Sequence, residues 1–525
     1  MARENPRESA EIVHNILSYL KAGCKQYRIV FPGERHNNSH EVKGMVDGKV
    51  LAARFAGAAD FETRKVISGG NELDIFFLDG LTSSGDIADF IVRPLHEARQ
   101  EEREETLFMR AARGLVWCAS MKEASSTDEA AELLVNGFCV ILFPKSGKAL
   151  GCEVKTGEKR SPSAPEAENT VKGAKDAFTE TLRTNTSLIR RHLRTPELRL
   201  EESVVGRRSL TKVTVCWVKG LTDPELPARM KKRLGEIDID GLLSPAAVEE
   251  YVTGSRKTAF PLLEFTERTD HFCQGLLDGQ VGLLVDGLPI GYLAPVSFGR
   301  LMRSPEDRAT DYLSASMLRI LRYLALGVSL LLPGIYAAMA MFHQQMLPTK
   351  LLLSIIESKQ DVPFSTLFEV VGLLCAFELL QQAGLHLPQA IGTAVSIIGG
   401  LVVGTAAVDA KLVSPAALIV TASSGICGFT LPNRELSDAL RLWRLVLTVF
   451  GGTAGLFGLS AGTILLLVHL AGLTSLGVAY LAPFSDARAR RAVLRPLLAR
   501  QKWRDATLRP QDLKNQGDGQ DENRK

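Results

Sequence analysis

The chain has 525 residues and a formal net charge of +3, with 46% hydrophobic and 23% charged residues. A charge so close to neutral, with no basic block alternating with aromatic residues, gives no reason to expect nucleic-acid binding. The mean hydropathy of +0.06 averages two unlike regions, because a charged front half is followed by long apolar stretches. We therefore expect a water-soluble front half followed by an α-helical, multi-pass membrane domain.

The front half shows no sign of export or of catalysis. The N-terminus has no apolar segment of signal-peptide length, so we expect this half to stay in the cytoplasm. The eight cysteines are scattered without CxxC or zinc-finger spacing, and we interpret them as reduced, buried, small hydrophobic residues. Lys145–Lys148 resembles a fragment of a phosphate loop but lacks the upstream glycine and the Ser or Thr after Lys148, and His36 and His40 lie in a loop-like segment. We predict no catalytic residue, metal or cofactor.

Two similar units follow one another in the front half. The short apolar strands Ile75–Leu81 and Val213–Leu221 end in the same Gly-Leu turn. A second matched pair, Leu133–Phe143 and Leu276–Leu284, follows the first pair after almost the same number of residues in each unit. An offset of about 140 residues therefore superimposes one unit on the other. The helix-period segments that follow the first pair are Ile87–Leu95 and Glu225–Leu234. Alternation of strands with helices predicts two similar α/β subdomains.

The segment between these units is rich in Pro, Glu and Ser over Lys155–Asn169, which indicates a linker. Apolar residues at helical spacing then predict a connecting helix over about Val171–Arg194. The predicted domains are a first α/β subdomain (1–155), a linker and connecting helix (156–204), a second α/β subdomain (205–300), a membrane domain with about five to six hydrophobic segments (320–481), and a basic, partly disordered cytoplasmic tail (482–525).

The first membrane segment is Tyr323–Phe342, which has no charged side chain and is long enough to cross a hydrocarbon core of about 30 Å. Pro333 should kink it. Arginines cluster before this segment, whereas the loop after it carries few cations, so the positive-inside rule places the front half in the cytoplasm. These arginines are Arg300, Arg303, Arg308, Arg319 and Arg322.

The second segment, Phe364–Leu380, carries two carboxylates, Glu369 and Glu378. Being nine residues apart on a helix, they point to opposite faces. A carboxylate inside a membrane is costly and is a functional hypothesis by default. Glu369, nearer the middle, is the better candidate for an ion path, and a structural hydrogen bond between helices is the alternative. Glu378 is a weaker candidate, because it can also reach the membrane interface.

Small residues mark the next two segments. In Ile391–Val408 they recur every four residues and predict close helix packing; they are Gly392, Ser396, Gly400 and Gly404. Leu412–Phe429 contains Pro415 and then small polar residues, which predict broken or re-entrant backbone that is buried in protein or lines a cavity. This pattern adds Thr421, Ser423 and Ser424 to the candidate ion path.

The last apolar stretch, Leu445–Leu481, is interrupted only by His469. As one helix it would be about 56 Å long, which exceeds a single crossing. The basic tail should stay inside, so we predict a closing hairpin that turns near Leu470–Thr474. One long crossing with an external tail is the alternative.

Several segments resemble the A-subunit family of bacterial spore germination receptors, above all Leu387–Pro432. The other matching segments are Leu182–Arg191, Val205–Leu226, Leu276–Gly287, Ser304–Asp307, Arg322–Met339 and Leu481–Asp486. The similarity recurs in order over about Phe61–Arg490. Two segments depart from the family pattern, the GLTSSGD turn of the first unit and the KGAKDAF stretch of the linker.

The resemblance implies a subunit of a nutrient-gated receptor complex in the inner membrane of a dormant endospore, which triggers release of monovalent cations and germination. It implies a homo-oligomer with a channel-like membrane part, in contact with membrane lipid, a transporter-like B subunit and a lipoprotein C subunit. A sporulation-specific paralogue without a nutrient role of its own is the alternative. A secondary transporter would require inverted repeats, which we do not find, and a membrane-tethered enzyme would require a catalytic motif.

Overall fold

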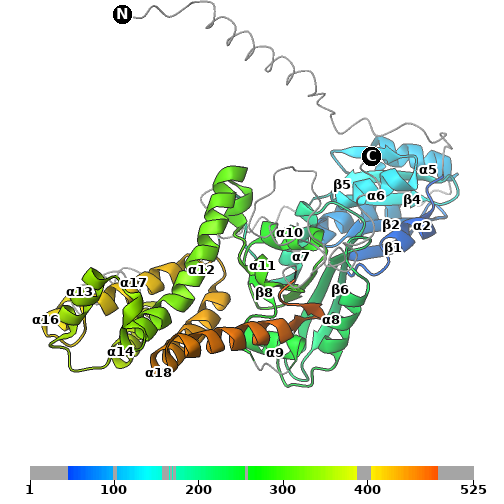
Figure 1. The fold of residues 1–525 in the computed structure, drawn as a ribbon. Coiled ribbons are helices and arrows are strands. Elements are labelled where there is room, and N and C mark those ends of the chain that lie inside the picture. The colour runs from blue at the N-terminus through cyan, green and yellow to red at the C-terminus, as the bar shows by residue number, and fades with distance from the viewer. Residues whose placement is uncertain are drawn as a thin grey trace, which may run out of the picture. The chain divides into compact units, whose positions relative to one another are not determined.

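The computed structural model describes residues 45–98, 103–155, 165, 168, 173–254, 258–386 and 404–482. These residues form two five-stranded sheets followed by a region of long helices (Figure 1). Several sequence predictions lie outside them: His36 and His40, most of the linker, Gly392, Ser396 and Gly400 of the third membrane segment, and the basic tail.

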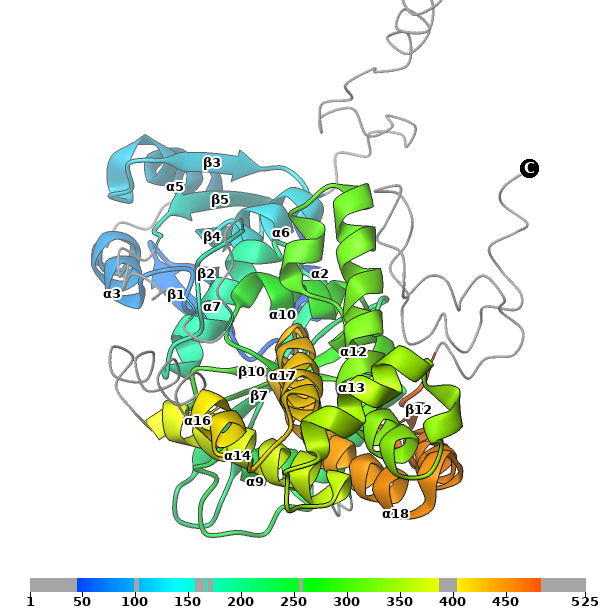
Figure 2. The same ribbon diagram turned by 60° about the vertical axis from the view of Figure 1, so that its left-hand side comes forward.

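The two sheets have the same strand order, β1-β2-β4-β5-β3 in the first and β6-β7-β9-β10-β8 in the second. All neighbouring strands are antiparallel. Figure 2 shows the first sheet with its strands side by side. The first sheet comprises β1 Phe61–Ser68, β2 Asn71–Leu78, β3 Met121–Ala124, β4 Phe138–Phe143 and β5 Lys148–Glu153; the second comprises β6 Leu198–Val205, β7 Thr211–Val218, β8 Glu264–Thr266, β9 Val281–Val285 and β10 Gly291–Ala294. The predicted pair of similar subdomains is confirmed.

Helices cover both faces of the first sheet. The central strand β4 is buried along its whole length, and its side chains alternate between two cores, with Ile141 in one and Val140 in the other. The core around Val140 includes α2 Gly48–Arg54 and α6 Thr127–Val135. The core around Ile141 is covered by α3 Ser84–Asp86, η2 Ile87–Val92, α4 Arg93–Glu97, α5 Glu104–Arg110 and η3 Ala111–Leu115.

The second sheet repeats this arrangement. α7 Leu182–His192 and α10 Thr269–Leu277 pack on one face, and α8 Glu225–Gly235 and α9 Pro245–Thr253 on the other. In both units a helix ends at a glycine with positive φ just before the central strand, Gly137 (82°) and Gly279 (88°). Glycine reaches this conformation at little cost, so the second matched pair of the sequence consists of a helix end, a glycine turn and a strand.

The connecting helix is shorter than predicted. α7 begins at Leu182 rather than Val171, because the preceding segment is fixed by other contacts. The Asn185 side chain accepts a hydrogen bond from the Thr179 N–H (2.8 Å) and donates one to the Thr179 carbonyl (2.6 Å). Phe178 packs edge-on against Phe272, with ring centroids 5.3 Å apart. These contacts hold the chain before Leu182 in a non-helical conformation.

A buried ion pair joins the two units. Arg190 of α7 donates to both carboxylate oxygens of Asp60, which precedes β1, at 2.7 and 2.8 Å. Both side chains are almost fully buried, at 1% and 2% exposure. A bidentate pair of this kind fixes orientation as well as distance. Arg183 extends the contact by pairing with Asp79 and Glu202.

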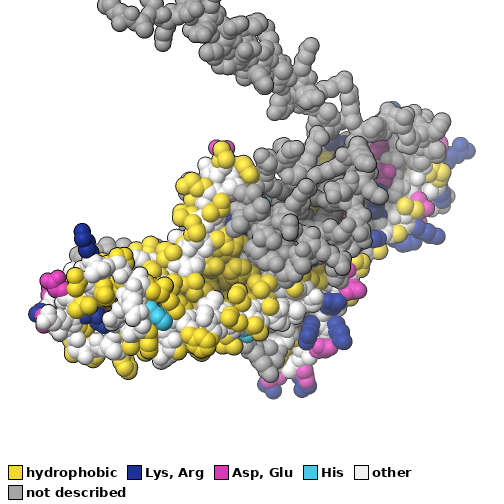
Figure 3. Space-filling model, in the orientation of Figure 1, with side chains coloured by type: hydrophobic (Ala, Val, Ile, Leu, Met, Phe, Trp, Pro, Cys, Tyr) yellow, Lys and Arg dark blue, Asp and Glu magenta, His cyan; other side chains and the backbone are white. Residues whose placement is uncertain are grey.

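Three helices of the described residues are long and apolar enough to cross a membrane: α12 Tyr312–Met341, α14 Thr366–His386 over its residues Thr366–Ala383, and α18 Arg434–Gly472. Shorter helices lie between them, α13 Thr349–Lys359, α16 Gly404–Asp409 and α17 Pro415–Phe429. Hydrophobic side chains cover much of the surface of this region (Figure 3). The first two predicted membrane segments lie in α12 and α14.

The helix α18 folds back on itself. Its dihedral angles leave the helical region at Ala454 and Gly455. The rings of Trp443 and His469 are 5.8 Å apart, although these residues would be separated by about 39 Å in a straight helix. The predicted hairpin is therefore present, but its turn lies at Gly455 and the prediction of Leu470–Thr474 was wrong. A single straight crossing is incompatible with these contacts.

The prediction of a broken fourth segment was also wrong. α17 is a regular helix from Pro415 to Phe429. Pro415 occupies its first turn, where a missing N–H costs nothing, and the Ser414 side chain caps the helix by accepting from the Ala417 N–H. The break in the described membrane region is at Gly455 of α18 instead.

Glycines bring α12 and α18 into backbone contact. A Cβ added at Gly451 would lie 2.5 Å from the Gly334 carbonyl oxygen. Small residues allow such close helix crossings in membranes. The sequence predicted this kind of packing only for the third segment, of which the structure describes Gly404 but not the other three small residues.

We expect Gly451→Ala to destabilise the protein by about 1–3 kcal/mol, since the added methyl group forces the backbones of α12 and α18 apart. Gly327→Ala on α12 is the matched control, because nothing lies within 4 Å of its added Cβ and alanine favours the helix. Thermal unfolding of the detergent-solubilised chain measures both effects. Equal melting temperatures for the two variants would contradict the crossing.

Candidate functional site at the junction of the second sheet and the membrane helices

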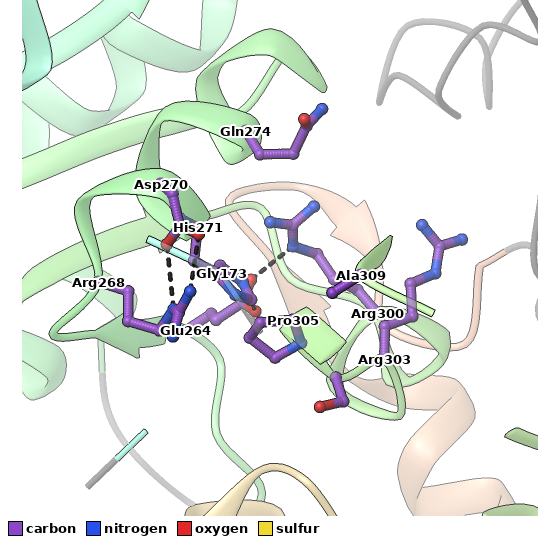
Figure 4. Close-up of a pocket in the computed structure, with 11 residues that line it drawn as sticks. Gly173, Glu264, Arg268, Asp270, His271, Gln274, Arg300, Arg303, Pro305 and Ala309 are labelled. Carbon is purple, nitrogen blue, oxygen red and sulfur yellow. Dashed lines mark hydrogen bonds and ion pairs between the residues drawn. The ribbon is translucent and has the colours of Figure 1, made fainter. Parts of the chain in front are cut away.

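A polar cavity of about 280 Å³ lies where the chain leaves the second sheet for the membrane helices. After β10 the chain forms α11 Phe298–Leu301 and the 3-10 helix η4 Pro305–Arg308 before α12 begins. The cavity lies between these two short helices and the second sheet with α10 (Figure 4). Its lining residues are Gly173, Glu264, Arg268, Asp270, His271, Gln274, Arg300, Arg303, Ser304, Pro305 and Ala309.

Arg300 links the membrane-proximal segment to the sheet. Its Nε lies 2.5 Å from Glu264 on β8, and its Nη1 lies 3.0 Å from Asp278 at the end of α10. Glu264 also contacts His271 Nε2 at 2.9 Å, as Figure 4 shows. The carboxylates of Glu264 and Asp278 are buried, so one guanidinium compensates two buried negative charges.

The electrostatics of Glu264 reflect this pairing. Burial by itself raises the pKa of Glu264, but the nearby Arg300 guanidinium and His271 outweigh burial and hold that pKa well below its usual range. Burial likewise lowers the pKa of Arg300, whereas Glu264 and Asp278 raise it above its ordinary value. Both groups are therefore charged at neutral pH.

A second ion pair lines the same cavity. Arg268 donates to both carboxylate oxygens of Asp270, at 3.0 and 2.7 Å. Gln274 donates to Asp278 at 3.0 Å. The cavity wall is thus built largely from paired charges, which hold the membrane-proximal segment against the second sheet. Among the described residues, no group of three or more His, Cys, Asp or Glu side chains could hold a metal ion.

Asp307 connects η4 to α12. It caps η4 together with Ser304 in a reciprocal capping box. Its carboxylate pairs with Arg319 at 2.9 Å and with Arg322 at 2.8 Å, and the three side chains are largely buried. From the sequence, the segment from Arg300 to Arg322 was expected to couple the α/β units to the helices, but the ion pairs that Arg300, Arg319 and Arg322 form were not predicted.

The chain also returns to the second sheet after α18. The short strands β11 Thr474–Ser475 and β12 Val478–Ala479 form a hairpin. Ser475 Oγ donates to the Leu262 carbonyl (2.7 Å) and accepts from the Val296 N–H (2.9 Å). The Phe298 N–H donates to the Tyr480 carbonyl at 2.8 Å. The second unit therefore holds both the entry to α12 and the exit from α18.

The structure places Glu369 in the first turn of α14, so the expectation that it lies near the middle of the segment was wrong. Its side chain is fully buried, accepts a hydrogen bond from the Ser414 N–H at the start of α17, and lies 3.5 Å from Lys359 Nζ. This is the structural hydrogen bond between helices that we considered as the alternative. A role in an ion path stays a prediction.

Three of the other candidate ion-path residues also have polar partners, either on a neighbouring helix or within their own helix. Glu378 pairs with Arg441 of α18 at 3.0 Å, on the opposite face from Glu369 as predicted. Ser424 donates to the Ser329 carbonyl at 2.7 Å, and Thr421 donates to the Ala417 carbonyl of its own helix at 2.8 Å. Ser423 is half-buried.

Arg444 is the polar residue of the membrane region that the sequence analysis missed. It is 3% exposed, its Nη1 lies 3.4 Å from Ser424 Oγ, and its Nη2 lies 3.8 Å from Glu378. It therefore brings two of the predicted residues together. The signal was available, because Arg441 and Arg444 are spaced for one helical face at the edge of an apolar run.

Comparisons with known proteins show to which family the chain belongs. The family model described as Bacillus/Clostridium GerA spore germination protein matches residues 49–512. Two relatives from Bacillus subtilis are each 34% identical: the uncharacterized membrane protein YfkQ, over 85% of this chain and 86% of its own length, and spore germination protein KA, over 85% and 83%. The crystal structure of the N-terminal domain of the A subunit of the Bacillus megaterium spore germinant receptor GerK3 covers 48% of this chain and 93% of its own, with 24% identity and a TM-score of 0.38.

A duplicated antiparallel α/β region is followed by three described helices long and apolar enough to cross a membrane, and its second unit contacts both the start of the first of these helices and the end of the last. This arrangement is that of a multi-pass membrane protein with a large soluble part. The chain belongs to the GerA family of spore germination proteins, the A-subunit family of spore germination receptors. The resemblance found in the sequence is confirmed.

We expect Glu264→Gln to destabilise the protein at neutral pH by about 3 kcal/mol, because it removes one charge of a buried pair. The folded-state pKa of Glu264 is depressed, so its stabilising contribution is fully present above the unfolded pKa of about 4.3 and declines as the pH falls below that value. The difference in melting temperature between wild type and variant should therefore narrow from pH 7 to pH 3.5. Glu62→Gln, at an exposed position of β1, should change little at either pH.

Proposed function

We propose that this chain is the A subunit of a nutrient germinant receptor in the inner membrane of the spore, with its α/β half in the cytoplasm. In this proposal it assembles as a homo-oligomer with a transporter-like B subunit and a lipoprotein C subunit. The assembly conducts monovalent cations when nutrient is bound and so starts germination. Family membership supports the receptor role, and the double attachment of the second unit to α12 and α18 supports the coupling.

The double attachment gives the coupling a physical form. Arg300 and Asp307 fix the start of α12, and Ser475 fixes the end of α18. A movement of the second unit therefore acts on both helices, which pack together at Gly334 and Gly451. Nutrient can shift this equilibrium only if it binds two conformations of the complex unequally.

The proposal predicts nutrient-dependent efflux of potassium or sodium from vesicles that contain the purified complex. Arg300→Lys keeps the charge but cannot bridge two carboxylates as a guanidinium does. We expect this variant to reduce the nutrient response about tenfold, which corresponds to about 1.4 kcal/mol of coupling. Arg207→Lys, in an exposed ion pair, is the control. An assembled wild-type complex that stays impermeable with and without nutrient would count against the channel role.

Substitutions at Glu369 separate its two possible roles. Glu369→Gln keeps an acceptor for the Ser414 N–H, whereas Glu369→Ala removes it. If Glu369 is structural, Gln should retain most of the germination and ion release, and Ala should lose them together with stability. If its charge serves the ion path, both variants should abolish ion release, although Gln, which keeps the acceptor for the Ser414 N–H but leaves Lys359 without its carboxylate, should lower the melting temperature less than Ala does. No effect of either variant would remove Glu369 from both roles.

The second candidate function is that of a sporulation-specific paralogue without a nutrient role of its own. The observation in its favour is that one relative with 34% identity, YfkQ, is described only as an uncharacterized membrane protein. Spores that lack this chain should then germinate normally in every nutrient. A defect towards one nutrient would favour the receptor role.

A further inference from the structure

The first half of α12 has an apolar face that stands exposed. Four side chains of this face are 42–77% exposed: Ile320, Leu324, Met317 and Leu313. Figure 3 shows hydrophobic side chains along α12. On the opposite face of the helix, Arg319 and Arg322 pair with Asp307 of η4. Ion pairs within the chain therefore hold one face of the helix, whereas the apolar face has no partner among the described residues.

These four residues, the α12 seam, follow the heptad spacing of a coiled coil. Intervals of four, three and four residues place Leu313 and Ile320 at d positions and Met317 and Leu324 at a positions. The spacing continues into the membrane segment, where Gly327 is at the next d position and nothing lies within 4 Å of an added Cβ. A surface that faces only lipid has to be apolar but needs no such register. The spacing therefore indicates contact with another helix.

The helix is also longer than one membrane crossing requires. Its 30 residues extend about 45 Å, whereas the hydrocarbon core is about 30 Å thick, so about ten residues lie outside it. The excess is at the start of the helix, because the ionised groups of Arg319 and Arg322 belong outside the hydrocarbon, whereas Tyr323–Met341 has no charged side chain. Lipid tails therefore do not cover Leu313 and Met317, and an apolar face exposed to water favours a protein partner.

We propose that the α12 seam is a contact between neighbouring copies of this chain, whose α12 helices pair as a parallel coiled coil. Copies inserted into the membrane in the same direction hold these helices parallel, so each seam residue lies opposite its own counterpart. The positions that flank the seam carry no charge, so identical copies do not repel one another there; they are Ser314, Ser316, Leu321 and Tyr323. Leu324 at an a position and Ile320 at a d position favour assemblies of more than two helices. The inference rests on the homo-oligomer of the proposed function and names its contact surface.

The test is disulfide cross-linking of single cysteines in vesicles that contain the purified complex. After oxidation with copper phenanthroline, Met317→Cys and Ile320→Cys should each give a dimer of this chain on a non-reducing gel, because a disulfide forms only between close Cα atoms. Leu318→Cys is the matched control, since Leu318 is also exposed, at 43%, but lies at a b position beside the seam. It should give severalfold less dimer. The unmodified protein, with Cys375 exposed on α14, sets the background.

A charge in the seam tests the same contact without relying on one distance. In the Met317→Cys protein, the additional substitution Ile320→Glu should abolish the cross-link, because it places like charges opposite one another in neighbouring copies. Leu318→Glu should leave the cross-link in place. Both positions are exposed in the single chain, so neither substitution disturbs its core.

Amine cross-linking of the wild type in the same vesicles shows separately whether the chain forms oligomers. If oligomers form but the seam cysteines link no better than Leu318→Cys, the seam is overturned and the homo-oligomer stands. A monomeric wild type overturns both. A disulfide from Met317→Cys to a native cysteine of the same chain, or to another subunit of the complex, overturns the seam as a contact between copies.

Discussion

The structure depends on the guanidinium of Arg300, which compensates two buried carboxylates of the second unit, Glu264 and Asp278. Two buried negative charges without this cation would carry an uncompensated desolvation cost of several kcal/mol. Separation of the ion pair is therefore costly, which favours an arrangement in which the segment that enters the membrane stays attached to the sheet. Asp307 extends this rigid link into α12 through Arg319 and Arg322.

A link at one end alone would let the helices slide independently of the sheet. The hairpin after α18 removes that freedom, because Ser475 is hydrogen-bonded to two backbone groups of the second unit. Between these attachments, α12 and α18 are in backbone contact at Gly334 and Gly451. The second unit and the two helices thus form a closed loop of contacts, which is the physical basis of the coupling that we propose.

Sequence patterns predicted those parts of the fold that depend on local chemistry. The duplicated units followed from apolar strands and from glycine turns such as Gly137 and Gly279, whose positive φ restricts the residue type. The features of the fold that the sequence analysis did not predict depend on tertiary contacts. Pro415 indicated a break, but it lies where a helix starts. The turn of the last hairpin was predicted too late in the chain, because the apolar stretch was counted from Leu445 whereas α18 already begins at Arg434 and bends at Gly455.

The same reasoning limits where a conducting path can lie. The charged candidates of the described membrane helices pair with other charges or backbone groups, Glu369 with Lys359 and Glu378 with Arg441, and Ser424 is bonded across a helix interface. A group that is already bonded within one copy can coordinate an ion only through a remaining lone pair or by exchanging its partner. The proposed conduction is compatible with a path between neighbouring copies and with a conformation in which these pairs exchange partners. Arg444, buried between Glu378 and Ser424, places a positive charge among these candidates, and such a charge opposes the passage of a cation close to it.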